Sequence, residues 1–214
     1  MRAGLVLAEV SISLVLLMGA GLLFPSYFLL RGESTLSAGL LLAPQGIGAM
    51  IAMPIAGVIA DKTGPGRIVL VGMVLITAGM AVFTQVGTNT SYTLLIGALF
   101  VMGLGLGSTM MPIMTAALQT LTNDTVARGS TLMNIVQQAA GSIGTALMSV
   151  VLTAQQKPAL TATDQVQAFD ISARAFGTTF MVALVLIVAT FVPAFFLPRT
   201  KHVSEGVAAP IVVH

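Results

Sequence analysis

Charged residues are scarce in this chain, and cysteine is absent. Only 7% of its 214 residues are Asp, Glu, Lys or Arg, whereas 56% are hydrophobic and the mean hydropathy is +1.00. A soluble domain would carry about a quarter of its residues as charged side chains, so the main solvent expected for this chain is membrane lipid. The net charge of +2 rests on too few basic residues to indicate a nucleic-acid partner.

The missing residue types also exclude several kinds of site. Without cysteine the chain has no disulfide, no thiolate metal ligand and no cysteine nucleophile. Both histidines, His202 and His214, lie near the C-terminus, so an intramembrane serine protease would lack a histidine base. No Walker sequence is present, which argues against an ATP-driven pump. We therefore expect no enzyme activity, no metal site and no cofactor.

Six long apolar segments follow one another along the chain, and each is long enough for a helix that crosses a bilayer, which needs roughly 20 residues. The segments cover residues 5–30, 39–60, 68–86, 92–118, 129–154 and 175–197. The sequence predicts an all-α membrane protein, with one six-helix unit over 1–197 and a short tail over 198–214. Residues 155–174 are expected to form a loop between the last two helices.

Basic residues near the segment ends predict the orientation in the membrane. With six spans, both termini lie on the same side. That side holds six basic residues: Arg2, Lys62, Arg67, Arg128, Arg199 and Lys201. The other side holds three: Arg31, Lys157 and Arg174. Because basic residues are enriched in cytoplasmic loops, both termini are expected in the cytoplasm.

Two of the apolar segments contain unusual small or polar residues. In the fourth, Gly103 and Gly107 have the small-x-x-x-small spacing that predicts close helix contact. In the fifth, polar and small residues recur at steps of three and four and so share one helical face; they are Asn134, Gln137, Gln138, Gly141, Ser142 and Thr145. Amides are costly in hydrocarbon unless they have partners. This face is therefore expected to meet either another helix or an aqueous path.

The turn between the second and third segments carries the most specific pattern. It contains Gly57, Asp61, Lys62, Gly64 and Arg67. A carboxylate near the C-terminus of a helix faces the negative end of the helix dipole, so Asp61 needs a favourable partner elsewhere. The expected partner is the start of the fifth helix, at residues 128–130. The alternative interpretation is a short solvated turn.

This pattern resembles the signature loop of the major facilitator superfamily. Three further segments, 36–57, 103–112 and 134–146, are similar to the final six-helix unit of its fourteen-helix drug/proton antiporter branch, the EmrB/QacA type. The resemblance implies that Gly57, Asp61, Lys62, Gly64 and Arg67 form a conformational latch. It also implies that the first and fourth helices line the substrate path and that the second and fifth lie between two bundles.

The function expected from this resemblance is export of small amphipathic compounds by alternating access, driven by a proton gradient. The chain would be the C-terminal half, in a bacterial cytoplasmic membrane, and its partner would be an N-terminal six- or eight-helix half in the same or another chain. Candidate residues of the substrate path are Ser13, Tyr27, Thr109, Met111, Thr115, Asn134, Gln137, Gln138 and Ser142. Glu9 is the candidate proton site, because it is the acid within an apolar segment. The alternatives are a non-transporting membrane scaffold and a truncated, inactive fragment.

Overall fold

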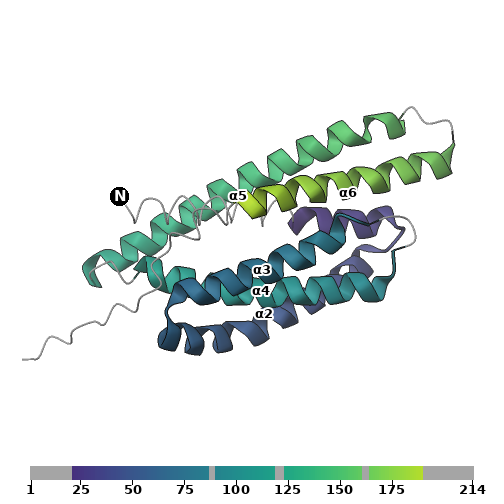
Figure 1. The fold of residues 1–214 in the computed structure, drawn as a ribbon. Coiled ribbons are helices and arrows are strands. Elements are labelled where there is room, and N and C mark those ends of the chain that lie inside the picture. Colours follow the sequence, from purple (N-terminus) through teal and green to yellow (C-terminus); the bar gives the residue numbers. More distant parts are fainter. Residues whose placement is uncertain (1–20, 87–89, 119–122, 161–163, 190–214) are drawn as a thin grey trace, which may run out of the picture.

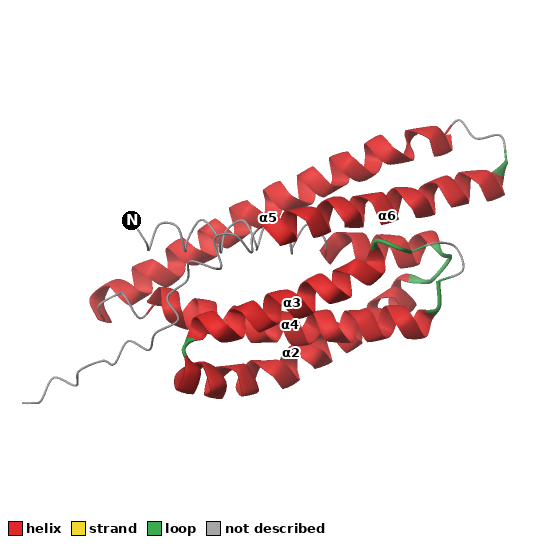
Figure 2. Ribbon diagram, in the orientation of Figure 1, coloured by secondary structure: helices red, strands yellow, loops and turns green. Residues whose placement is uncertain are grey.

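The computed structural model describes residues 21–86, 90–118, 123–160 and 164–189. Within these ranges the chain is helical and contains no strand (Figure 2). A short helix, Gly21–Leu30, comes first. The labelled helices in Figure 1 are α2 (Thr35–Thr63), α3 (Pro65–Phe83), α4 (Tyr92–Leu118), α5 (Asn123–Leu160) and α6 (Gln165–Ala189).

The predicted fold class is confirmed. Each of the five helices α2 to α6 is long and apolar enough to cross a membrane. The helix α4 has the bounds of the predicted fourth segment, 92–118. Proline occurs inside α2, at Pro44 and Pro54, and inside α4, at Pro112. Such residues are tolerated in membrane helices because neighbouring groups satisfy the backbone positions that proline frees.

The ends of α2 follow from local chemistry. Ser34 caps its N-terminus, and the side-chain oxygen accepts a hydrogen bond of 3.1 Å from the Ser37 amide. At the other end, Gly64 has a φ of 87°, a conformation that side chains disfavour, and its amide donates to the Ala60 carbonyl at 2.9 Å. Pro65 then begins α3 at a position where a missing amide hydrogen costs nothing. These residues set a sharp reversal between α2 and α3.

The last two helices differ from the prediction. The predicted loop 155–174 is wrong, because α5 continues to Leu160 and α6 already begins at Gln165. Asp164 explains the early start of α6, since its carboxylate accepts from the Val166 amide at 3.2 Å. At about 1.5 Å per residue, the 38 residues of α5 span about 57 Å, well beyond the hydrocarbon core of about 30 Å. Hydropathy did not predict these helix ends, because polar residues that lie outside the lipid do not stand out as apolar segments.

Helix packing divides the bundle into two groups. The helices α2, α3 and α4 form one group, in which α4 packs closely on both neighbours, while α5 and α6 run side by side as a hairpin (Figure 1). The hairpin meets the first group mainly through contacts of α6 with α3. Between α5 and α4 the contacts are sparse.

Glycines allow the close approach of α4 to its neighbours. A methyl group at Gly103 would overlap the backbone of Gln45 in α2, and one at Gly107 would overlap the Ala49 carbonyl. On the other side of α4, a methyl group at Gly105 would lie 2.6 Å from the Gly72 carbonyl of α3. The predicted close contact at Gly103 and Gly107 is therefore confirmed.

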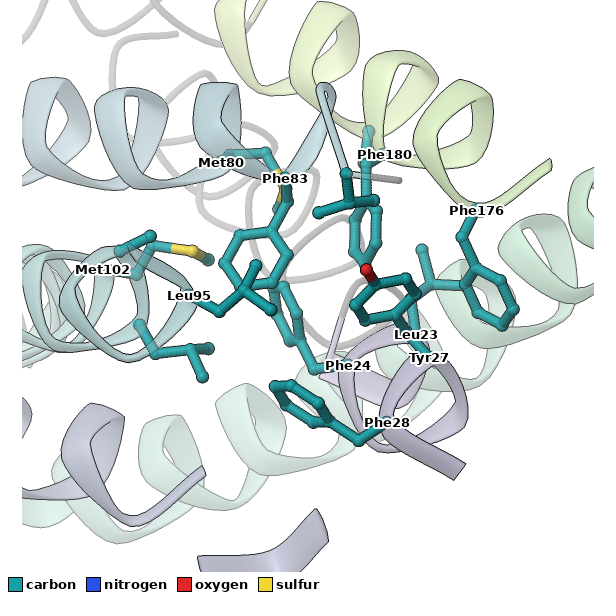
Figure 3. Packing of buried hydrophobic residues seen from close by; sticks show 14 of the residues in the cluster. Leu23, Phe24, Tyr27, Phe28, Met80, Phe83, Leu95, Met102, Phe176 and Phe180 are labelled. Atoms are coloured by element: carbon teal, nitrogen blue, oxygen red, sulfur yellow. The ribbon is translucent and has the colours of Figure 1, made fainter. Parts of the chain in front are cut away.

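An aromatic cluster joins the two groups of helices (Figure 3). Phe24 of the first helix stacks on Phe180 of α6 at 5.2 Å and meets Phe83 of α3 edge-on at 4.7 Å. Tyr27 and Phe176 continue the cluster, with ring centroids 5.7 Å apart. Such ring pairs add to the packing that holds membrane helices together.

Candidate functional site

The polar face of α5 lines an open groove of about 540 Å³. Its lining residues are Gln138, Gly141, Ser142, Thr145, Ala146 and Ser149. The groove is hollow because small residues repeat along one face of α5 at steps of three and four. None of these lining residues is charged, so a ligand would be held by hydroxyl and amide groups and by apolar contact.

On this face of α5, two side-chain hydroxyls form hydrogen bonds within the helix, whereas the side-chain amide of Gln138 does not. Ser142 Oγ donates to the Gln138 carbonyl at 2.9 Å, and Thr145 Oγ1 donates to the Gly141 carbonyl at 2.7 Å. Within the described part of the chain, the side-chain amide of Gln138 makes no hydrogen bond. An amide in that position needs water, a ligand or a polar partner. Gln138 is therefore the group in the groove that is most available for recognition.

The other predicted path residues lie in several places. Asn134 is exposed one turn before the groove, and Gln137 is half-buried beside it. Thr109 is buried where α4 meets α3, with its hydroxyl donating to the carbonyls of Gly105 and Leu106. Met111 is 53% exposed on α4. The structure thus brings Gln138 and Ser142 together but does not place Thr109 beside them.

Tyr27 lies in the aromatic cluster and is fully buried, so its ring packs against Phe28 and Phe176 instead of an open cavity. Ser13 and Glu9 lie outside the described residues, as does the side chain of Thr115. The groove also contains Ala146 and Ser149, which the sequence prediction did not include. Their signal was present, because Ser149 follows Ser142 by seven residues and so lies on the same helical face.

The turn of the predicted latch lies at one end of the α2–α3–α4 group. Gly64 is buried, whereas Lys62 and Arg67 are exposed on either side of it. Gly57 is half-buried, yet a methyl group there would meet no atom within 4 Å. The chain's own packing therefore needs a glycine at position 64 for its backbone conformation, but it does not need one at position 57.

The start of the fifth helix does not lie at residues 128–130, where the partner of Asp61 was expected. The helix α5 begins at Asn123, so residues 128–130 lie inside the helix and offer no free N-terminal amides. No contact between α2 and α5 appears among the described residues. The side chain of Asp61 itself lies outside the described part.

Metal ligands do not gather in the described part of the chain. No group of three His, Asp, Glu or Cys side chains there could hold a metal ion.

The fold, the glycine-lined helix contacts and the signature turn define a class of membrane transporters. Residues 3–145 match the model of the Major Facilitator Superfamily, and the chain belongs to this family. It is therefore an integral membrane protein of a transporter family. The crystal structure of tetrameric PepTSo2 has a similar fold, with a TM-score of 0.62 over 89% of this chain and 40% of that one, at 16% identity.

Several curated relatives carry names of resistance proteins. The Multidrug resistance protein B homolog of Mycobacterium tuberculosis is 41% identical over 86% of this chain and 40% of its own length. The Lincomycin resistance protein LmrB of Listeria monocytogenes is 32% identical over 72% of this chain and 32% of its own. The Puromycin resistance protein pur8 of Streptomyces alboniger is 26% identical over 88% of this chain and 40% of its own. The chain spans about two fifths of the length of the first of these relatives.

Proposed function

We propose that this chain is the C-terminal six-helix half of a proton-coupled exporter of small amphipathic compounds, of the fourteen-helix EmrB/QacA branch. The relatives named for multidrug, lincomycin and puromycin resistance support drug export as the activity. Transport would proceed by alternating access, with two bundles rocking about a site between them. The proposed setting is a bacterial cytoplasmic membrane, with both termini in the cytoplasm, as the basic residues favour.

The observation that carries the proposal is the unequal burial of the helices. In the most apolar 18-residue stretch of each helix, only 17% of the residues of α2 and 22% of those of α5 are buried. The buried share is 50% in α3 and 44% in both α4 and α6. The two least buried helices are those expected between the bundles. They carry the signature turn and the polar groove. A second bundle, in the same or another chain, would cover the apolar surface of these two helices.

Gly57 supports the same docking. Glycine in a helix interior costs about 1 kcal/mol relative to alanine, yet no atom of the described chain lies within 4 Å of a methyl group at this position. Close approach by a second bundle would supply a reason for glycine. In the described structure, by contrast, Gly103 and Gly107 are required by contacts inside this chain.

Efflux of a fluorescent amphipathic dye tests the proposal. Cells that lack their own exporters would express this chain alone, then with the preceding six- or eight-helix half of the Mycobacterium tuberculosis relative, or with the native upstream half where one exists. Efflux only with both halves, and its loss when the proton gradient is collapsed, is the expected result. No efflux in any combination, despite good membrane expression, would favour a scaffold or an inactive fragment. Efflux by the chain alone would indicate a homo-oligomer.

Two glycine variants make the test residue-specific. Gly57→Ala should lower efflux by both halves together while leaving the thermal stability of this chain unchanged or slightly raised. Gly97→Ala is the matched control, because a methyl group added at position 97 in α4 would also meet no atom within 4 Å. Equal efflux by the two variants would contradict a docking role for Gly57.

A further inference from the structure

A cluster of charged and aromatic side chains lies at the end of the bundle opposite the Gly64 turn. The guanidinium carbon of Arg31 lies 4.2 Å from the centroid of the Tyr92 ring, and Arg31 Nη1 donates to the Thr90 carbonyl at 2.8 Å. The Tyr92 hydroxyl donates to Glu33 Oε1 at 2.9 Å. The two hydrogen bonds each connect residues 59 positions apart in the chain. They join the end of the helix Gly21–Leu30 to the start of α4.

The backbone between the two helices holds Arg31 and Glu33 in place. Gly32 has a φ of 86°, and its amide donates to the Leu29 carbonyl at 3.0 Å. The amides on either side of Gly32, from Arg31 and Glu33, donate to the carbonyls of Tyr27 and Phe28 at 3.1 and 3.2 Å. This arrangement terminates the first helix in a fixed geometry, and the Ser34 cap begins α2 immediately afterwards. The side chains of Arg31 and Glu33 are therefore attached to a backbone segment that these hydrogen bonds hold in place.

The closest partners of both charges lie on the α4 side, although Arg31 also lies 5.9 Å from the Tyr27 ring of the first helix. Arg31, Glu33 and Tyr92 are all half-buried, and a partly desolvated charge is costly without a partner. The planar guanidinium stacks over the Tyr92 ring and donates a charge-assisted hydrogen bond at the same time. Lysine cannot reproduce both contacts with the same geometry. Loss of Arg31 would leave the junction attached to α4 by the Tyr92–Glu33 hydrogen bond at 2.9 Å and the Phe28–Tyr92 stack at 6.4 Å.

We propose that Arg31 is a positioning residue of the transport cycle, which fixes the first helix to α4 so that the two move as one body. This inference rests on the proposed transport function, because these two helices are the ones expected to line the substrate path. A substrate-binding role is not part of the proposal. The groove lies on α5, and the contacts between α5 and α4 are sparse.

Cysteine labelling tests the inference without any need for transport. The chain has no native cysteine, so a single introduced thiol is the only target of a water-soluble maleimide. Ala38 and Ala56 are each 2% exposed and lie near opposite ends of α2. We expect Arg31→Gln to raise the labelling rate of Ala38→Cys about tenfold, which corresponds to about 1.4 kcal/mol. The rate of Ala56→Cys should stay within about twofold.

Variants of Tyr92 separate the stacking contact from the hydroxyl contact. Tyr92→Leu should raise labelling of Ala38→Cys at least as much as Arg31→Gln does, because it also removes the contacts of Tyr92 with Glu33 and Phe28. The double variant should be little worse than Tyr92→Leu alone. Tyr92→Phe keeps the ring and should have a smaller effect. Unchanged labelling of Ala38→Cys in Arg31→Gln would overturn the inference. Faster labelling at both positions would overturn it as well, because the whole bundle would then have loosened.

Transport kinetics distinguish positioning from general stability. In cells that show dye efflux, Arg31→Gln should lower the maximal rate per folded molecule about tenfold and leave KM within about twofold, with Arg31→Lys in between. An unchanged rate per folded molecule would show a merely structural role, and a raised KM with an unchanged rate would show substrate contact. Absence of efflux by the unaltered protein would count against the proposed function, while the labelling result would still decide the role of Arg31.

Discussion

The contact between α2 and α4 provides the sharpest test of the packing. At Gly103, an added methyl group would overlap the Gln45 carbonyl oxygen, and it would lie 2.8 Å from the carbonyl carbon and 2.9 Å from Cα of the same residue. All three atoms belong to the backbone, so no change of side-chain rotamer can make room. Gly103→Ala must therefore push the two helices apart.

The expected cost follows from this separation. Forcing extra atoms into a packed interior costs about 1–3 kcal/mol, and the upper end applies here because the whole helix must move. Alanine recovers about 1 kcal/mol of helix propensity relative to glycine. The net destabilisation is therefore about 2 kcal/mol. For a chain of this length, this corresponds to a fall in Tm of about 4–8 °C.

Thermal unfolding in detergent micelles would measure this difference. Gly97→Ala is the control, since it lies in the same helix, gains the same propensity and has open space around the added methyl group. It should keep or slightly raise Tm. If Gly103→Ala proves as stable as Gly97→Ala, the close approach of α2 to α4 at this glycine is wrong.

Three further substitutions test other features. Gly64→Ala should destabilise the chain by about 1 kcal/mol or more, because alanine is strained at a φ of 87°; a thermal scan beside Gly57→Ala, which should be neutral or slightly stabilising, would reveal it. Ser34→Ala should cost about 1 kcal/mol by removing the cap of α2, and an unchanged Tm would show that the cap contributes nothing. Phe180→Ala should cost about 3 kcal/mol, since Phe180 packs against both Phe24 and Phe83; chemical unfolding in mixed micelles would measure the loss, and a value below about 1 kcal/mol would contradict the described aromatic cluster.

Hydropathy predicted the helices well where lipid sets their limits. The segment 92–118 is an uninterrupted apolar run, and the structure gives α4 the same bounds. It failed at Gln155–Leu160 and after Asp164, where polar residues continue α5 and begin α6. Helix formation there depends on propensity, on the Asp164 cap and on contact between the two helices. None of these three factors changes the average hydropathy of a segment, so hydropathy cannot predict them.

The site residues were predictable to the extent that they share one helix. The face containing Gln138 and Ser142 follows from spacing alone, because the geometry of a single helix is known in advance. The placement of Tyr27 was not predictable in this way, since its burial depends on Phe176, 149 positions later in the chain. The contact of Arg31 with Tyr92 likewise requires knowledge of which helix ends meet.

The chemistry of the polar face of α5 limits what this face can meet. The hydroxyls of Ser142 and Thr145 are satisfied by their own helix, so they are compatible with either surrounding. The exposed Gln138 amide needs water or a polar partner, because within the described residues it has no hydrogen-bond partner. We therefore expect water along this face in the proposed assembly of two halves.

Adjacent cysteine substitutions would test this expectation. Ser142→Cys should react with a water-soluble maleimide about tenfold faster than Ile143→Cys, whose position is 58% exposed in this chain but carries an apolar side chain suited to lipid. The measurement requires both halves in the membrane, since an uncovered face would be accessible for another reason. Equal, slow labelling at both positions would mean that a neighbouring helix covers Ser142. The amide of Gln138 would then bind that helix, and the groove would be an interface between bundles instead of a path for substrate.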